Sequence, residues 1–148
     1  MANARQVASF FIEESSRLNE NNDLTNLKLQ KILYFAQVEH LKQFERPLFD
    51  DPIEAWQYGP VVRDVYEWLK GCGAYQISKF DIETSIDGLD DATLTFLKGI
   101  WEKYRRYSAF GLVDKTHEEG SAWSNTYKNG EGNFQIIQIS DLAKTPTL

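Results

Sequence analysis

The residues best suited to acid–base chemistry in this sequence are His117 and Glu118. A zinc-protease helix begins with the same pair, but its second histidine ligand lies one helical turn further on, where this chain has Ser121. Acid–base catalysis by His117 and Glu118 in a small hydrolase-like enzyme is the last-ranked of the functions considered. His40, His117 and Cys72 are too few for a typical structural zinc site, and such histidines are more often hydrogen-bonded structural residues. The sequence therefore predicts a protein that is no enzyme and needs no metal or cofactor.

Aromatic side chains are the second group of interest, since they make up 14% of the chain. Trp68 and Trp101 lie within helical patterns, which favours core packing. Trp56, Tyr58 and Trp123 fall beside non-helical backbone, where a ring can pack its body inward and present its polar edge to a partner. Packing is the commoner role even there. These three rings are our candidates for partner binding.

The charge balance argues against nucleic acid as a partner of the chain alone. The sequence has 22 acidic and 16 basic residues, a formal net charge of −6, which disfavours binding to a phosphate backbone. Lys28, Lys31 and Lys42 on one predicted helix, with Arg105-Arg106 on another, could form a local basic patch, although scattered lysines usually belong to a solvated face. A DNA-binding regulator of its own operon remains an alternative function.

Length and composition predict one compact domain over residues 1–148, since 148 residues with 42% hydrophobic content can bury a core. No apolar run approaches the roughly 20 residues of a membrane helix, so no membrane association is expected. The first residues show no signal-peptide layout, and a single cysteine suits a reducing compartment. We expect a cytoplasmic protein.

Helical periodicity is clearest in the first half of the chain. Residues from about Asn3 to Leu18 carry an apolar stripe, which the polar run 19–23 then breaks. Thr25 can cap a second helix, with Leu24 and Leu29 placed as a hydrophobic staple, and Pro47 ends it. Much of this second helix is apolar around its circumference, so we expect it to be the central one.

The rest of the chain mixes short helices with a small sheet. Gly59 and Pro60 suit the cap and first position of a third helix. The alternation in 80–86 predicts a strand that pairs with 134–139. Asp90 should cap a further helix, Ser108 should start one that runs to about Glu119, and Ser121 should begin a short helical turn. Ser140 should cap a final helical stub. The predicted fold is mainly α, a compact bundle of about five to six helices with a small β-hairpin or two short strands, and residues 140–148 form a flexible tail.

Three separated motifs resemble one protein family. They are the segment 27–37 (LKLQKILYFAQ), the segment 55–62 (AWQYGPVV) followed by Tyr66, and the segment 112–117 followed by Trp123. In this order they are similar to the SocA-like antitoxins with a Panacea domain, a family that includes the GepA proteins of phages and mobile genetic elements. The resemblance extends from about Ala4 to Trp123.

This resemblance implies a mostly helical antitoxin that neutralises a toxin encoded beside it by direct binding. For part of the family the antitoxin is thought to act as a proteolytic adaptor that hands the toxin to a ClpXP-type protease. The family-motif residues are expected to be structural, and they are Leu29, Gln30, Lys31, Leu33, Tyr34, Gly59, Pro60, Val61, Tyr66 and His117.

Overall fold

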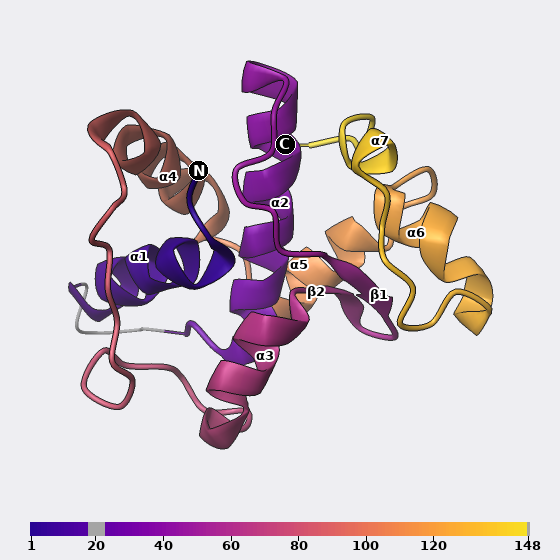
Figure 1. The fold of residues 1–148 in the computed structure, drawn as a ribbon. Helices are drawn as coiled ribbons and strands as arrows, with labels where there is room; N and C mark the ends of the chain where they lie inside the picture. Colours follow the sequence, from indigo (N-terminus) through magenta and orange to yellow (C-terminus); the bar gives the residue numbers. More distant parts are fainter. Residues whose placement is uncertain (18–22, 148) are drawn as a thin grey trace.

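The computed structural model describes residues 1–17 and 23–147 (Figure 1). Within them are seven α-helices and one antiparallel sheet of two strands, which confirms the predicted mainly α fold. Leu18 and residues 19–22, part of the predicted first helix and of the break after it, lie outside the described residues. The elements are α1 (Ala4–Arg17), α2 (Asn26–Phe44), β1 (Glu54–Trp56), β2 (Gly59–Val61), α3 (Arg63–Leu69), α4 (Asp91–Tyr104), α5 (Ala109–Thr116), α6 (Ala122–Tyr127) and α7 (Ile139–Leu142), with 3₁₀ turns at Lys70–Cys72 and Lys128–Gly130.

Helix α2 runs through the middle of the molecule, as its apolar circumference predicts (Figure 1). It contacts α1, α3, α4, α5, α7 and β2. The Thr25 side chain caps it by accepting a hydrogen bond from the Lys28 amide, and Leu24 and Leu29 are both fully buried. The helix ends where Glu45 adopts a left-handed conformation, two residues before Pro47. A helix in contact with neighbours on all sides can hold side chains that reach several other elements.

Three later helices begin where the sequence predicts, and each has a side-chain cap. Asp90 accepts a hydrogen bond from Thr93 N at the start of α4, and Ser108 does the same for Gly111 N at the start of α5. Ser121 accepts from Ser124 N at the start of α6. Each cap satisfies an amide that has no partner within the helix. Helix α5 ends at Thr116, before the expected end at Glu119.

The prediction that Gly59 and Pro60 start a helix is wrong, because both lie in strand β2. The register pairs Ala55 with Pro60, while the amide and carbonyl of Ala55 bond to Gln135 and Phe134 on the other side of β1. Pro60 therefore stands in a position without a ladder hydrogen bond, where its missing donor costs nothing. Helix α3 starts two residues after the strand, at Arg63.

The predicted strand at 80–86 is also wrong, because these residues form turns and irregular structure. Asp81 N and Ile82 N both bond to Ser78 O. The segment expected to pair with it lies instead beside β1: Phe134 N donates to Ala55 O over 2.7 Å and Ile137 N to Ile53 O over 2.8 Å. An alternating pattern indicates which side chains are half-buried, but it does not predict which segment pairs with the backbone.

Residues 139–145 pack on the helices beside them. Helix α7 starts at Ile139, with Gln138 rather than Ser140 at its cap. Leu142 and Thr145 are buried, and Thr145 Oγ1 accepts a hydrogen bond from Ala122 N over 3.0 Å. The flexibility predicted for residues 140–148 stays a prediction, and this packing opposes it up to Thr145.

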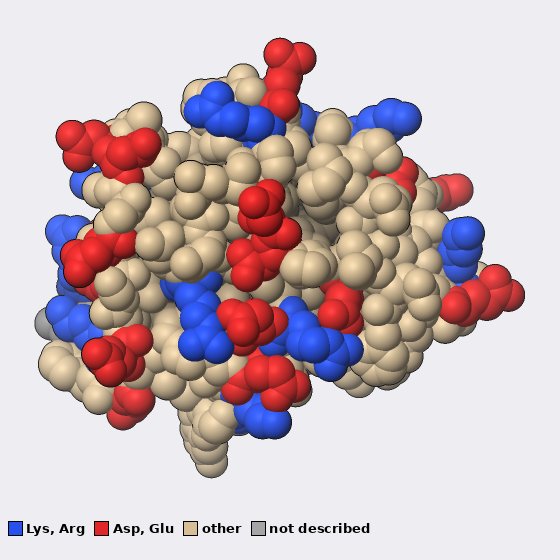
Figure 2. All heavy atoms as spheres, viewed as in Figure 1, with Lys and Arg blue, Asp and Glu red and all other residues tan. Residues whose placement is uncertain are grey.

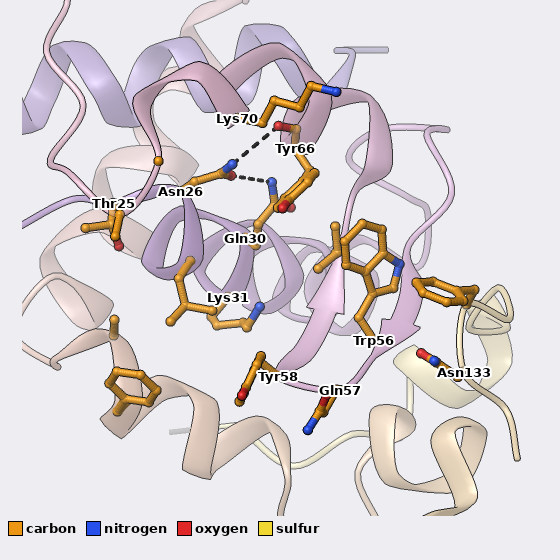
Figure 3. Close-up of a pocket in the computed structure, with 17 residues that line it drawn as sticks. Thr25, Asn26, Gln30, Lys31, Trp56, Gln57, Tyr58, Tyr66, Lys70 and Asn133 are labelled. Atoms are coloured by element: carbon orange, nitrogen blue, oxygen red, sulfur yellow. Dashed lines mark hydrogen bonds between the residues drawn. The ribbon is translucent and has the colours of Figure 1, made fainter. Parts of the chain in front are cut away.

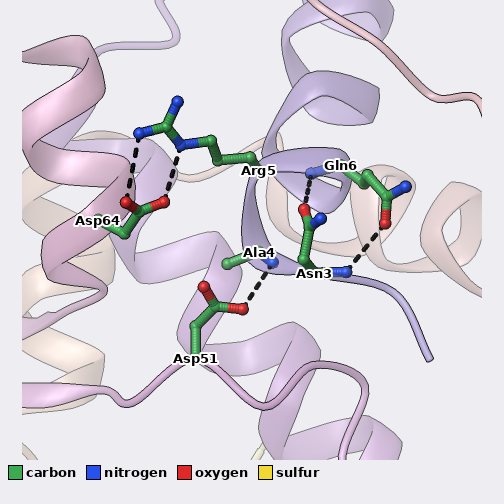
Figure 4. A network of polar contacts seen from close by, with 6 residues as sticks. All are labelled: Asn3, Ala4, Arg5, Gln6, Asp51 and Asp64. Carbon is green, nitrogen blue, oxygen red and sulfur yellow. Dashed lines mark hydrogen bonds and ion pairs between the residues drawn. The ribbon is translucent and has the colours of Figure 1, made fainter.

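Polar contacts fasten helix α1 to the elements around it (Figure 4). Asn3 and Gln6 exchange two hydrogen bonds of 2.8 and 2.9 Å, which cap the helix. Ala4 N donates to Asp51 Oδ1 over 2.9 Å, and the Arg5 guanidinium binds both oxygens of Asp64 on α3. These contacts fix α3, which forms one wall of the site described next. In the part of the chain that the structure describes, no helix is long and apolar enough to span a bilayer.

Candidate partner-binding site

A pocket with a volume of about 640 Å³ opens at the N-terminal end of α2 (Figure 3). Its walls come from the first turns of α2, the β1–β2 hairpin, α3 with the turn after it, the start of α5 and residues 133–134. The lining residues are Thr25, Asn26, Leu27, Gln30, Lys31, Trp56, Gln57, Tyr58, Val61, Tyr66, Lys70, Gly73, Ala74, Ala109, Phe110, Asn133 and Phe134. Two segments of the sequence motifs, from α2 and from the hairpin, thus meet at one cavity.

Lys31 lies at the inner wall of this pocket and is fully buried. Its Nζ donates to Pro60 O over 3.1 Å, and no carboxylate of residues 1–17 or 23–147 lies within ion-pair distance. Burial disfavours the charged amine and lowers the pKa of Lys31 from 10.5 to about 7. A large fraction of this amine is therefore neutral near pH 7.

The expectation of a solvated lysine face on α2 is wrong for two of its three members. Lys28, like Lys31, is fully buried, and its Nζ binds Asp23 Oδ1 over 2.8 Å and Arg105 O over 2.7 Å. Only Lys42 is exposed. Helix α2 thus offers one of these lysines to a phosphate backbone, which removes the patch on which the DNA-binding alternative depended.

Gly59 has a conformation and a position that only glycine suits. Its φ of +113° disfavours any side chain, and an added Cβ would lie 2.8 Å from Lys31 Cε and 2.9 Å from Thr116 Oγ1. The hairpin can therefore lie directly on the Lys31 side chain and on the end of α5. The Lys and Gly of the two motifs are a packed pair.

Gln30 joins α2 to the junction between β2 and α3. Its Oε1 accepts from Val62 N over 2.8 Å, and its Nε2 donates to Asn26 Oδ1 over 3.0 Å. Asn26 Nδ2 in turn donates to Tyr66 O over 3.3 Å (Figure 3). This chain of amides satisfies backbone groups where two elements meet. These hydrogen bonds fix the position of α3 relative to α2, and therefore the two pocket walls that these helices form.

Of the three predicted partner-binding rings, two lie at the pocket and one lies behind it. Tyr58 is 58% exposed, and Trp56 is half-buried between Tyr66 and Phe134, with ring centroids at 4.9 and 5.3 Å. Trp123 is only 7% exposed, and it holds the hairpin in place because its Nε1 donates a hydrogen bond to Trp56 O over 2.7 Å. Trp56 and Tyr58 are thus available to a partner, whereas Trp123 presents little more than an edge.

His117 and Glu118 do not come together in a cleft. The His117 ring stacks on Trp123 with 3.8 Å between centroids, and Glu118 is exposed with its carboxylate 3.5 Å from Lys115 Nζ. Burial, and then the charge of Lys31, lower the pKa of His117. Its Nε2 is buried and has no hydrogen-bond partner among the described residues. His40 is packed elsewhere, with its Nδ1 2.7 Å from Arg46 O.

The family model described as "Antitoxin SocA-like, Panacea domain" matches residues 29–124. The chain belongs to this family. It is also 31% identical to "Antitoxin SocA" of Caulobacter vibrioides (strain NA1000 / CB15N) over 138 residues, which cover 87% of this chain and 72% of that protein. No solved structure matches.

The Panacea match contains the inner wall of the pocket but not its whole rim. Gln30, Lys31 and the complete hairpin lie within residues 29–124, as do α3 and the start of α5. Of the other motif residues, Leu29, Leu33 and Tyr34 are fully buried in the core, Val61 is buried in the hairpin and Tyr66 is half-buried. The first turn of α2 and residues 133–134 fall outside the match.

The sequence did not predict two of the rings at the rim of the pocket. Phe110 is 65% exposed and Phe134 is 53% exposed. A signal for Phe110 was present, because it lies outside the apolar stripe of α5 formed by Ala109, Leu112, Val113 and Thr116. The exposure of Phe134 could not be predicted in this way. Phe134 follows a glycine-rich loop, and nothing in the sequence indicates its φ of +68°.

Proposed function

We propose that this chain is an antitoxin that neutralises a toxin encoded beside it by direct protein–protein binding, through the face around the pocket. Membership of the SocA-like family supports the antitoxin role. The observation that carries the choice of face is the clustering of Tyr58, Phe110 and Phe134, three large rings that are each more than half exposed, around one cavity. Exposed apolar surface concentrated in one place marks interaction sites in soluble proteins.

The interior of the face is suited to stay rigid when a partner binds. Trp56 is held by Tyr66, Phe134 and the Arg63 guanidinium, which lies 5.1 Å from its ring centroid. Arg63 is in turn bound to Glu54 by two hydrogen bonds of 2.8 and 2.9 Å. A preorganised aromatic anchor loses little conformational entropy on binding, which favours affinity.

Co-expression with the product of the adjacent gene tests this proposal. The two chains are expected to elute together on size exclusion as a stable complex, and the toxin activity should be lost in the complex. A neighbouring protein that stays fully active and elutes separately contradicts the proposal.

Delivery to a ClpXP-type protease is a further form of the same function. It requires that the half-life of the toxin shorten when this chain is present, and that deletion of the protease abolish the shortening. An unchanged half-life of the toxin would contradict delivery to a protease, and neutralisation by binding alone would remain as the proposed function. We also propose a cytoplasmic location, since a protein with the single cysteine Cys72 suits a reducing compartment.

A further inference from the structure

We propose that the pocket receives a segment of the partner protein in which a large apolar side chain adjoins a carboxylate. The identity of the partner as a toxin rests on the proposed function, whereas the chemistry of the segment follows from the pocket itself.

The apolar half of the inference comes from the pocket walls. Trp56, Tyr66, Phe110 and Phe134 present rings to one cavity of about 640 Å³. Cavities of about 300 to 1,000 Å³ enclose ligands of drug size, which is the size of one large side chain with its adjoining backbone. Phe110 makes no aromatic contact with the other described rings, so its ring is available to stack on an incoming side chain.

The acidic half comes from the charges around the cavity. The chain has 22 acidic residues, yet none of those within residues 1–17 and 23–147 lines the pocket, where the charged side chains are Lys31 and Lys70. Lys31 is buried behind the wall, where its Nζ donates to Pro60 O, and only its protonated fraction near pH 7 adds positive charge to the cavity. Lys70 is exposed at the rim, 2.7 Å from the exposed carboxylate of Glu67, an ion pair that solvent weakens.

The N-terminal end of α2 adds to the same field. Thr25, Asn26 and Leu27 of its first turn line the cavity, so the positive end of the helix dipole faces it. A carboxylate in the pocket therefore meets the Lys70 amine, the protonated fraction of Lys31 and a helix N-terminus, whereas the Glu67 carboxylate at the rim is already paired with Lys70. Charge complementarity selects an acidic segment and rejects a basic one.

Nucleic acid fits this surface less well than a protein segment does. Tracking a phosphate backbone requires a groove with several cations beside the stacking rings. At this pocket, Lys70 is the exposed lysine, and nearby Arg63 is already bound to Glu54. On the face drawn in Figure 2 the basic and acidic side chains are interspersed rather than gathered in a basic stripe.

Titration of the ¹⁵N-labelled chain with capped tripeptides tests the inference without a toxin. The probes are acetyl-Glu-Phe-Asp-amide, acetyl-Gln-Phe-Asn-amide and acetyl-Lys-Phe-Lys-amide, with an oligothymidine as the nucleic-acid arm. The readout is the indole N–H signal of Trp56, assigned with Trp56→Phe. We expect the acidic peptide to shift this signal with a Kd about tenfold below that of the basic one, and the neutral peptide to lie between them.

Matched variants separate the two halves of the inference. Phe110→Ala should weaken all three peptides, and Lys70→Gln should abolish the preference of acidic over neutral. Phe80→Ala removes a ring that is 86% exposed outside the pocket, and Lys98→Gln removes an exposed lysine of α4, so both should leave the binding unchanged.

Equal affinity for acidic and basic peptides, no shift of the Trp56 signal, or tighter binding of oligothymidine overturns the inference. If the peptides bind as expected and the toxin forms no complex, only the proposed function fails. If the toxin binds but the peptides show no preference, the proposed function stands and the inference about the pocket is wrong.

Discussion

Replacing Lys31 by methionine should remove most of the pH dependence of stability in mildly alkaline solution. The pKa of Lys31 is about 7 in the folded chain, against an ordinary value of 10.5. Between these two values the unfolded chain holds a proton that the folded chain lacks, so the free energy of unfolding rises with pH. The slope is about 1.4 kcal/mol per pH unit. The wild-type chain should therefore gain about 3 kcal/mol over two pH units within this window, and the variant should gain almost nothing.

Other buried groups leave this window clear. Burial lowers the pKa of His117 and His40 below 6.5, so the pH dependence of stability that they cause lies below that value and levels off above it. Burial raises the pKa of Tyr34 above its ordinary value of 10, so Tyr34 changes the pH dependence of stability only above pH 9.5. The gain between pH 7.5 and 9.5 is thus assigned to Lys31.

Urea unfolding followed by tryptophan fluorescence measures the effect at pH 7.5, 8.5 and 9.5. Lys98→Met serves as the matched control, because Lys98 is exposed on α4 and should keep the wild-type profile. Parallel pH profiles for the wild type and Lys31→Met would refute the reasoning, since they would mean that Lys31 keeps its charge inside the fold.

Two further substitutions test how the motif residues hold the pocket. Gly59→Ala should destabilise the chain by about 2 kcal/mol or more, because it combines a strained φ with a Cβ 2.8 Å from Lys31 Cε. Gly71→Ala, whose Cβ would meet nothing within 4 Å, is the control, and equal urea midpoints for the two variants would contradict this account. Gln30→Met should cost about 1 to 3 kcal/mol in the same assay, because it leaves Val62 N buried without an acceptor. A wild-type midpoint for Gln30→Met would show that this hydrogen bond is dispensable.

Local signals in the sequence predicted the starts of α2, α4, α5 and α6, whereas the pairing of strands distant in the sequence was not predicted. Thr25 and Asp90 were identified as caps and Ser108 and Ser121 as helix starts, because a cap depends on a side chain and an amide three residues away. The segment 134–137 lies instead beside β1, about 80 residues earlier in the chain, and no local pattern encodes that pairing.

The site was predicted in part for the same reason. Trp56 and Tyr58 were recognised because they fall beside non-helical backbone, but the burial of Lys28 and Lys31 was not predicted. A signal for it existed: a central helix that is apolar around much of its circumference has no solvated face for lysines to occupy. Phe110 became a rim residue only through the packing of α5 against α2.

The growth of cells that express the neighbouring toxin tests the central claim most directly. The wild-type chain and the matched surface variant Phe80→Ala should restore growth. The double variant Tyr58→Ala/Phe110→Ala should not, although its circular dichroism spectrum and urea midpoint match those of the wild type. Full rescue by the double variant would contradict binding through the pocket face, and no rescue by the wild type would contradict the antitoxin function itself.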